Sequence, residues 1–268
     1  MNRIDQIFAD RRASGLRTLM PFVCAGHPDP DGTGEVLVAL QEAGASIVEV
    51  GFPFSDPIAD GPVVAGAMHE ALGRGVTPAR VLEAVAAVRS RLTIGLVAMV
   101  SVSIVHRMGG AGRFAALARQ AGFDGLILPD VPVEEAKPVR EAAIEAQLTA
   151  SFLLAPTTPV ARAQSIVQAS TGFVYVLARS GVTGEQSTAP DIAGRVSKLR
   201  QITPLPIAVG FGISKPEHVR AVTEHADAAI VGSALVKRIA DAPSRGQRPA
   251  DAAKEFCTSL VGGLFSQG

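Results

Sequence analysis

Hydrophobic residues along this chain gather in short runs that recur from one end to the other. The runs are rich in Val, Ile and Leu, and their apolar residues are continuous rather than alternating with polar ones. Continuous runs are typical of parallel strands that are covered on both faces. We therefore predict eight buried strands, at residues 19–24, 46–51, 94–100, 125–130, 149–155, 173–178, 206–212 and 227–232.

The segments between these runs carry helix signals. Thr77 and Thr158 each precede a proline, so each is predicted to cap a helix with proline at its first position. Ser214 and Glu217 have the spacing of a capping box. Apolar residues at positions 4, 7 and 8 indicate a short amphipathic helix near the N-terminus.

Strand and helix alternate eight times, which predicts an α/β fold of the (β/α)8 or TIM-barrel type. The long interval between the second and third strands leaves room for an extra helix at residues 62–75. The length fits a single barrel domain over residues 1–268, since such barrels usually take ~250 residues. A doubly wound open sheet is the alternative, but it more often has a glycine fingerprint after the first strand, and residues 23–30 lack one.

The second predicted strand ends on a carboxylate, Glu49, in the stretch "EVGFPFSDPIADGP". Barrel enzymes carry catalytic side chains at the C-terminal ends of their strands. Burial among apolar residues raises the pKa of a carboxyl group, as a general acid working near neutral pH requires. The structural alternative is a strand-end carboxylate tied to a backbone amide or an arginine.

Three further acids lie at predicted strand ends or in the loops beyond them. Asp60 precedes a Gly-Pro pair where a helix can start, so it is either functional or an N-cap. Asp56 precedes a proline, and turn formation explains it. Asp130 ends the fourth strand, where catalysis and capping of the following helix are both open.

A phosphate site is predicted after the last two strands. Gly210 and Gly212 precede a helix, and Gly232 and Ser233 open another. Glycine allows close approach of the backbone, and a helix N-terminus presents N–H groups to an anion. The loops after strands seven and eight of a barrel are the usual place for phosphate. The polar loop at 179–190 is expected to close over the same anion as a lid, with Gly184 near it; the alternative, a mobile surface loop, is compatible with this.

Composition excludes several classes of function. Lys+Arg and Asp+Glu are both 25, so nucleic acid is an unexpected partner. Cys24 and Cys257 form neither a disulfide framework nor a zinc motif, which favours a reducing cytoplasm. The N-terminus lacks the apolar core of a signal peptide, and the longest apolar run, 92–105, is too short to span a bilayer. The five histidines are scattered, so no metal site is predicted.

The motifs together resemble the alpha subunit of tryptophan synthase. They come in the family's order and span nearly the whole chain, and the PFSDP-x-x-ADGP loop is specific. The matching segments are 21–30, 49–62, 125–136, 152–159, 176–184, 208–214 and 230–237.

The resemblance implies a retro-aldol cleavage of indole-3-glycerol phosphate to indole and glyceraldehyde 3-phosphate, without metal or organic cofactor. No lysine stands at the end of a predicted strand, so an imine is not expected. By resemblance, Glu49 protonates C3 of the indole ring and then helps remove the proton of the side-chain hydroxyl. Asp60 hydrogen-bonds the ring N–H and stabilises the cation that C3 protonation creates.

The resemblance also implies binding residues. Residues that match substrate-binding positions are Phe22, Tyr175, Leu177, Thr183 and Phe211, with barrel core as the alternative for Leu177. Those that match the phosphate site are Gly184, Gly212, Ile213, Gly232 and Ser233. Asp56 and Pro57 match residues that face a beta subunit, and the implied assembly is an α2β2 heterotetramer.

The chain departs from the family pattern after the third strand. Many relatives carry a tyrosine and an asparagine there, whereas this chain has apolar and serine residues over 99–104. The departure implies a less polar indole pocket on that side and a changed contact with a beta subunit. Two alternatives therefore stay open: a stand-alone indole-releasing lyase, and a silent subunit that only activates a beta partner.

Overall fold

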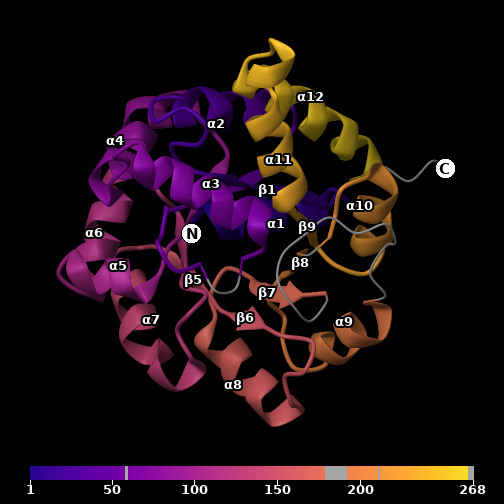
Figure 1. Ribbon diagram of the computed structural model, residues 1–268. Coiled ribbons are helices and arrows are strands. Elements are labelled where there is room, and N and C mark those ends of the chain that lie inside the picture. Colours follow the sequence, from indigo (N-terminus) through magenta and orange to yellow (C-terminus); the bar gives the residue numbers. More distant parts are fainter. Residues whose placement is uncertain (58–59, 179–191, 211, 265–268) are drawn as a thin grey trace.

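All strands of the protein run parallel in one sheet, which curls into a nearly closed barrel (Figure 1). The computed structural model describes residues 1–57, 60–178, 192–210 and 212–264. The strands lie in the order β5-β4-β3-β2-β1-β9-β8-β7-β6. Their bounds are β1 Thr18–Cys24, β2 Ile47–Gly51, β3 Gly95–Met99, β4 Gly125–Ile127, β5 Thr149–Ser151, β6 Leu153–Leu154, β7 Val174–Leu177, β8 Ile207–Gly210 and β9 Ala228–Val231.

The eight predicted strands are confirmed, with the fifth split in two. β5 pairs with β4, and β6 pairs with β7, so this one segment closes the barrel from both sides. Between them, the N–H of Phe152 donates to Ser170 Oγ instead of to a neighbouring strand. The apolar run at 149–155 does not indicate the break between β5 and β6, because the acceptor, Ser170, lies 18 residues further along the chain.

Helices surround the barrel (Figure 1). Their bounds are α1 Arg3–Ala13, α2 Thr33–Glu42, α3 Pro62–Gly73, α4 Pro78–Val88, α5 Val102–Arg107, α6 Ala111–Ala121, α7 Ala136–Glu145, α8 Val160–Ala169, α9 Ala193–Arg200, α10 Pro216–Thr223, α11 Ser233–Asp241 and α12 Pro249–Val261. The predicted extra helices at the N-terminus and after the second strand are α1 and α3. The short helix α5 was not predicted. Within the described ranges, no helix has the length and apolarity needed to cross a membrane.

Side chains along each strand alternate between two hydrophobic layers. On β2, Ile47 belongs to the cluster inside the barrel, whereas Val48 and Val50 belong to the layer between barrel and helices. Both layers are apolar, which explains the continuous runs. Because alternation puts every second residue on one face, Glu49 points into the barrel with Ile47.

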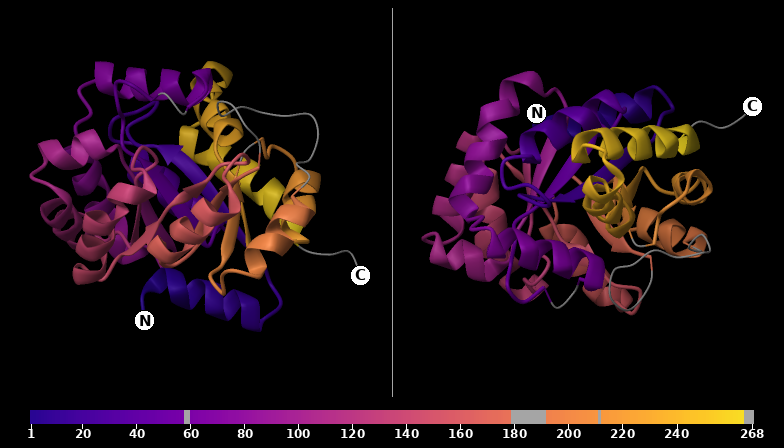
Figure 2. Two further views of the ribbon diagram at one scale, coloured as in Figure 1. Left: turned by 90° about the horizontal axis from the view of Figure 1, so that it is seen from below. Right: turned by 45° about the horizontal axis from the view of Figure 1, so that its top comes forward.

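Helix α1 closes the N-terminal end of the barrel (Figure 2). Its Ile4 and Phe8 are buried in the inner cluster, and Ile4 occupies the space left by the missing side chain of Gly95. Ion pairs fix both ends of the helix, Arg3 to Asp124 at 3.5 Å and Arg12 to Asp227 at 3.2 Å. The opposite end, where the strands have their C-termini, forms the mouth of the barrel.

One of the predicted helix caps is confirmed and two are wrong. Thr77 caps α4, and its side chain accepts the N–H of Arg80. Helix α8 begins one residue later than predicted, because Thr158 Oγ1 instead accepts the N–H of Ala155 in its own turn. The predicted capping box before α10 does not form, since the N-cap is Lys215 and no side chain caps the helix.

Candidate active site

Glu49 is fully buried near the end of β2, beside Phe22 on β1 and Val97 on β3. Neither of its carboxyl oxygens has a hydrogen-bond partner among the described residues. Burial raises the pKa of Glu49 well above its usual range. The expectation of a raised proton affinity is therefore confirmed, and the alternative of a carboxylate tied to an amide or an arginine finds no support in the described part of the chain.

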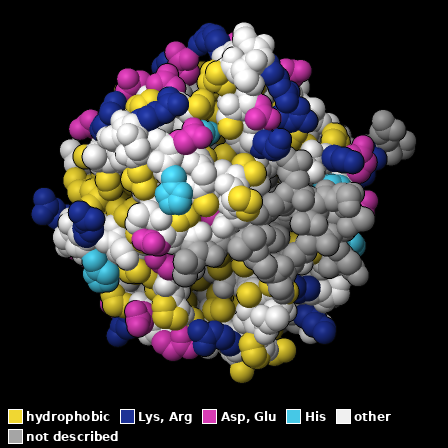
Figure 3. All heavy atoms as spheres, in the orientation of Figure 1, with side chains coloured by type: hydrophobic (Ala, Val, Ile, Leu, Met, Phe, Trp, Pro, Cys, Tyr) yellow, Lys and Arg dark blue, Asp and Glu magenta, His cyan; other side chains and the backbone are white. Residues whose placement is uncertain are grey.

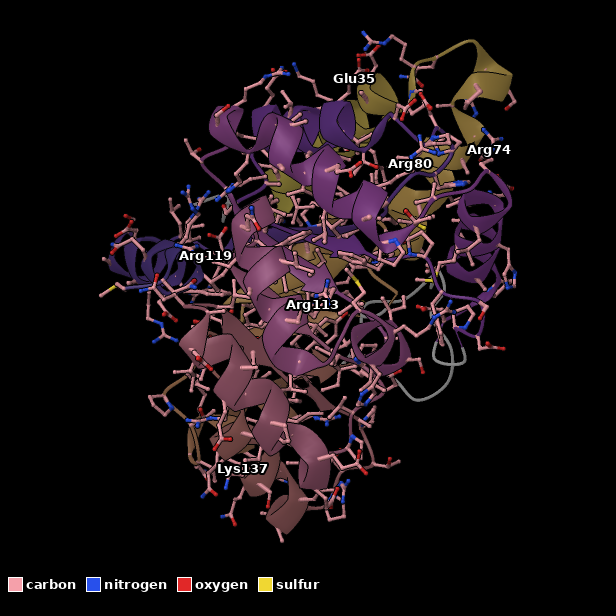
Figure 4. All side chains as sticks on the ribbon, turned by 90° about the vertical axis from the view of Figure 1, so that its left-hand side faces the viewer. Glu35, Arg74, Arg80, Arg113, Arg119 and Lys137 are labelled. Carbon is pink, nitrogen blue, oxygen red and sulfur yellow. The ribbon has the colours of Figure 1, made fainter. Side chains whose placement is uncertain are left out.

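Asp60 stands where the loop after β2 enters α3. The N-cap of α3 is Gly61, and no side chain caps this helix, so the interpretation of Asp60 as an N-cap is wrong. Burial raises the pKa of Asp60 to about 6. Three of the basic residues labelled in Figure 4 are Arg80 on α4, Arg113 on α6 and Lys137 on α7; these helices lie outside the barrel, whereas Asp60 lies at its mouth.

A small cavity at the mouth of the barrel, here called the first cavity, brings seven of the predicted residues together. Its volume is about 50 Å3. Of the residues predicted as functional, it is lined by Phe22, Asp60, Tyr175, Gly212, Ile213, Gly232 and Ser233. Four further lining residues were not predicted as site residues: Val64, Met99, Ile230 and Ala234. A polar–apolar pattern does not reveal them, because each has the pattern of ordinary core.

Tyr175 connects the two acids electrostatically. It is the only tyrosine of the chain, and its side chain is buried opposite β2 in the inner cluster. Burial raises the pKa of Tyr175 well above its usual range, and the charges of Glu49 and Asp60 raise it further. The phenol therefore stays a neutral hydrogen-bonding group at neutral pH, within electrostatic reach of both carboxyl groups.

One wall of the first cavity is suited to an anion. Helix α11 begins at Ser233, and no side chain caps its N-terminus, where Gly232 is the N-cap. A side chain at Gly232 would find no described atom nearer than Phe22 Cβ, at 3.9 Å. Gly212 has a φ of +79°, which glycine adopts without strain. Backbone groups from two loops thus face the same space.

Seven predicted site residues are not among those that line this cavity. Glu49 is buried next to Phe22, which does line it, and Asp56 and Pro57 lie on the loop after β2. Thr183, Gly184 and Phe211 lie outside the described residues. Leu177 is half-buried and packs against the inner cluster, and it does not line the first cavity. Its carbonyl accepts a hydrogen bond from Arg195 at 3.3 Å.

A second cavity of about 360 Å3 adjoins the first at the mouth. Asp60 and Met99 line both cavities. Asp56 and Pro57, the predicted partner-facing residues, line the second cavity, and Asp56 accepts a hydrogen bond from Ser55 Oγ at 2.7 Å. Figure 3 shows hydrophobic side chains spread over this face of the molecule.

Asp130 has a different role from those expected of it. It accepts hydrogen bonds from Ser101 Oγ at 2.7 Å and from the N–H of Val102 at 3.0 Å. It therefore caps α5, which precedes it in the chain, and not the helix that follows. Sequence analysis missed this contact because α5 itself was not predicted.

The barrel, the two acids at its mouth and the wall suited to an anion define a class of protein. They are the features of a (β/α)8-barrel enzyme that combines proton transfer with recognition of an anionic substrate.

Comparisons with known proteins identify the family. The family model for the tryptophan synthase alpha chain matches residues 8–262. A tryptophan synthase alpha chain from Synechococcus sp. (strain CC9902) is 46% identical over 255 residues, which cover 94% of each chain. A crystal structure of the alpha chain from Legionella pneumophila subsp. pneumophila has a TM-score of 0.90 at 32% identity, covering 100% of this chain and 99% of that one. A structure of Mycobacterium tuberculosis tryptophan synthase has a TM-score of 0.89 at 32% identity, with 98% of each chain covered.

This chain belongs to the tryptophan synthase alpha chain family, whose members are lyases of tryptophan biosynthesis.

Proposed function

We propose that Glu49 and Asp60 carry out the family's reaction in this chain, the cleavage of indole-3-glycerol phosphate to indole and glyceraldehyde 3-phosphate. The single observation that supports this most strongly is the state of Glu49. Glu49 is fully buried, its pKa is raised, and neither of its carboxyl oxygens has a described hydrogen-bond partner. Burying such a group lowers the stability of the fold, so its presence here points to a role in proton transfer.

Glu49 acts first as an acid and then as a base. It gives its proton to C3 of the indole ring, which places a positive charge on the ring. The carboxylate then takes the proton of the hydroxyl group on the adjacent side-chain carbon. The C–C bond breaks, its electron pair restores the aromatic ring, and the hydroxyl carbon becomes the aldehyde. The proton that Glu49 gave stays on C3 of the released indole, and the hydroxyl proton restores the acid form of Glu49, so the cycle is balanced.

Asp60 stabilises the cation formed between these steps. Its pKa of about 6 leaves it ionised at neutral pH, although it is largely buried. An ionised carboxylate that accepts the ring N–H stabilises the ring more strongly once the ring is positively charged. Because the interaction is stronger in the cation than in the bound substrate, it lowers the activation free energy of the cleavage. Phe22 and Tyr175 would hold the ring between them, together with Leu177, Thr183 and Phe211.

The phosphate binds at the wall formed by the last loops. The backbone at Gly212, Ile213, Gly232 and Ser233 supports this, because those residues line the same cavity as Asp60. Gly184 is proposed to complete the site from the loop after β7. The chemistry needs only protons and fixed charges, so neither a cofactor nor a metal is part of the proposal. The described residues contain no cluster of His, Cys, Asp and Glu suited to a metal ion.

Family membership implies a beta subunit as partner. We propose an α2β2 assembly in the cytoplasm, with the beta subunit covering the mouth at Asp56 and Pro57. Asp56 is exposed and Pro57 is partly exposed, which supports this placement.

The test is indole release from indole-3-glycerol phosphate, measured with and without a beta subunit. Release by the isolated chain that a beta subunit accelerates supports the proposal. Equal release in both conditions identifies a stand-alone lyase. No release in either condition, with activation of the beta subunit's own reaction, identifies a silent activating subunit.

A further inference from the structure

The first cavity is the smaller of the two, at about 50 Å3, and in the proposed function it already holds the indole ring and includes the phosphate wall. The second cavity is larger, at about 360 Å3, and is lined mainly by apolar residues. Any extra atoms on the ring would therefore need a way from the first cavity into the second.

Met99 stands where the two cavities meet. It is the last residue of β3, it is half-buried, and it lines both spaces. Its side chain packs against the inner cluster of the barrel and against the cluster around Phe22 and Met68. Methionine is unbranched and has three rotatable bonds, so it fills irregular gaps in alternative rotamers at little cost.

The backbone of Met99 is held in the sheet, so only its side chain is free to change position. The carbonyl of Met99 accepts the N–H of Phe52 at 2.9 Å, and its Cα pairs in register with Gly51 and Ile127. A rotamer change of Met99 would join the two cavities without moving a strand.

We infer that Met99 determines substrate specificity: by moving aside, it lets the site accept indole-3-glycerol phosphates that carry a substituent at C6 of the ring. This inference rests on the proposed function, because it uses the pairing of Asp60 with the ring N–H and the phosphate wall for orientation.

The position of the substituent follows from that orientation. Gly212, Gly232 and Ser233 line only the first cavity, so the C3 side chain with its phosphate points away from the second cavity. Asp60 lines both cavities, so the ring N–H lies at their junction. On an indole, C6 and C7 lie on the N–H side of the benzene ring, and C4 lies beside C3. A group at C7 would crowd the contact between the ring N–H and Asp60. C6 is therefore the position on this side from which a group can point towards Met99 and the second cavity, whereas a group at C4 meets the glycerol phosphate.

The experiment uses the reverse reaction, the condensation of an indole with glyceraldehyde 3-phosphate by the isolated chain. For each variant, kcat/KM is measured with indole, with 4-methylindole and with 6-methylindole, and each methylindole value is divided by the indole value. For the wild type, 6-methylindole should stay within about threefold of indole, and 4-methylindole should fall at least tenfold. A tenfold fall corresponds to ~1.4 kcal/mol and is measurable. Equal losses for the two methylindoles would overturn the inference.

Two substitutions at Met99 should move the 6-methyl ratio in opposite directions. Met99→Ala should raise it by opening the passage, and Met99→Phe should lower it about tenfold by filling the passage with a stiffer side chain. Met108→Phe is the matched control: Met108 is also half-buried, but it lines neither cavity, so the ratio should not change.

Met99 does not set specificity if its substitution changes kcat/KM by the same factor for all three indoles, or if the ratio of 6-methylindole to indole stays unchanged in both Met99 variants. If the chain condenses no indole at all, the proposed function fails. The inference is then tested by the binding of 6-methylindole and 4-methylindole, measured by calorimetry. If the wild type binds 6-methylindole no more tightly than 4-methylindole, the inference is overturned.

Discussion

At the scale of single residues, the two acids of the site are made different by their surroundings. Both are raised in pKa by burial, Glu49 well above its usual range and Asp60 to about 6. Burial thus favours the protonated form of Glu49, whereas Asp60 is mostly ionised at neutral pH. One barrel thus holds a proton donor and a negative charge at the same mouth.

The raised pKa values of Glu49 and Asp60 predict how the activity depends on pH. Cleavage needs ionised Asp60, so kcat/KM should rise as pH increases through about 6 and then level off. It should fall again at higher pH, where Glu49 loses its proton. Asp60→Asn should remove the acidic limb and lower the plateau by about 10²–10³-fold. A limb near pH 4 in the wild type would mean that Asp60 is not the titrating group.

At the scale of elements, the start of α11 is where substrate binding should be most easily weakened. The Cβ that Gly232→Val adds would find no described atom nearer than Phe22 Cβ, at 3.9 Å. The side chain would stand where the phosphate is proposed to bind, and KM should rise about tenfold or more, or ~1.4 kcal/mol. Gly194→Val in α9, also in open space, is the matched control. An unchanged KM in both variants would place the phosphate elsewhere.

The sequence predicts the elements better than their ends. Continuous apolar runs predict the strands because both faces of a parallel sheet are covered, and Glu49 is noticed because it interrupts such a run. The break at Phe152 and the capping of α5 by Asp130 depend on contacts between segments that are distant in the sequence. Local pattern carries no information about them.

The candidate site shows the same division. Glycines and acids at strand ends are visible in the sequence, and the structure brings seven of the predicted residues to one cavity. Met99 and Val64 were missed because apolar residues at strand and helix ends look like core. Only the geometry of the barrel shows that they line a cavity.

At the scale of the whole molecule, stability should depend on the helix that closes the barrel. Phe8 is buried against Phe173, with ring centroids 5.8 Å apart, so Phe8→Ala should cost about 3–5 kcal/mol of unfolding free energy. Val160→Ala, at a site that is 68% exposed, should change it by less than about 0.5 kcal/mol. Urea unfolding measures both. Similar midpoints for the two variants would mean that α1 does not contribute to the core.

Assembly with a beta subunit should change the rate. Docking at Asp56 and Pro57 would cover the mouth and exclude water from the cleavage, so turnover should rise by one or more powers of ten, at ~1.4 kcal/mol each. Asp56→Lys reverses the charge of an exposed residue and should abolish the increase while leaving the turnover of the isolated chain in place. An increase that survives in Asp56→Lys would place the interface elsewhere.

The central claim is that a buried, protonated Glu49 starts the cleavage. Its most direct test is indole release from saturating indole-3-glycerol phosphate by the wild type and by Glu49→Gln, with substrate affinity measured alongside. The amide has the same shape but cannot give a proton. Turnover should fall by about 10²–10⁴-fold while substrate affinity stays close to that of the wild type. Near-native turnover of Glu49→Gln would contradict the account.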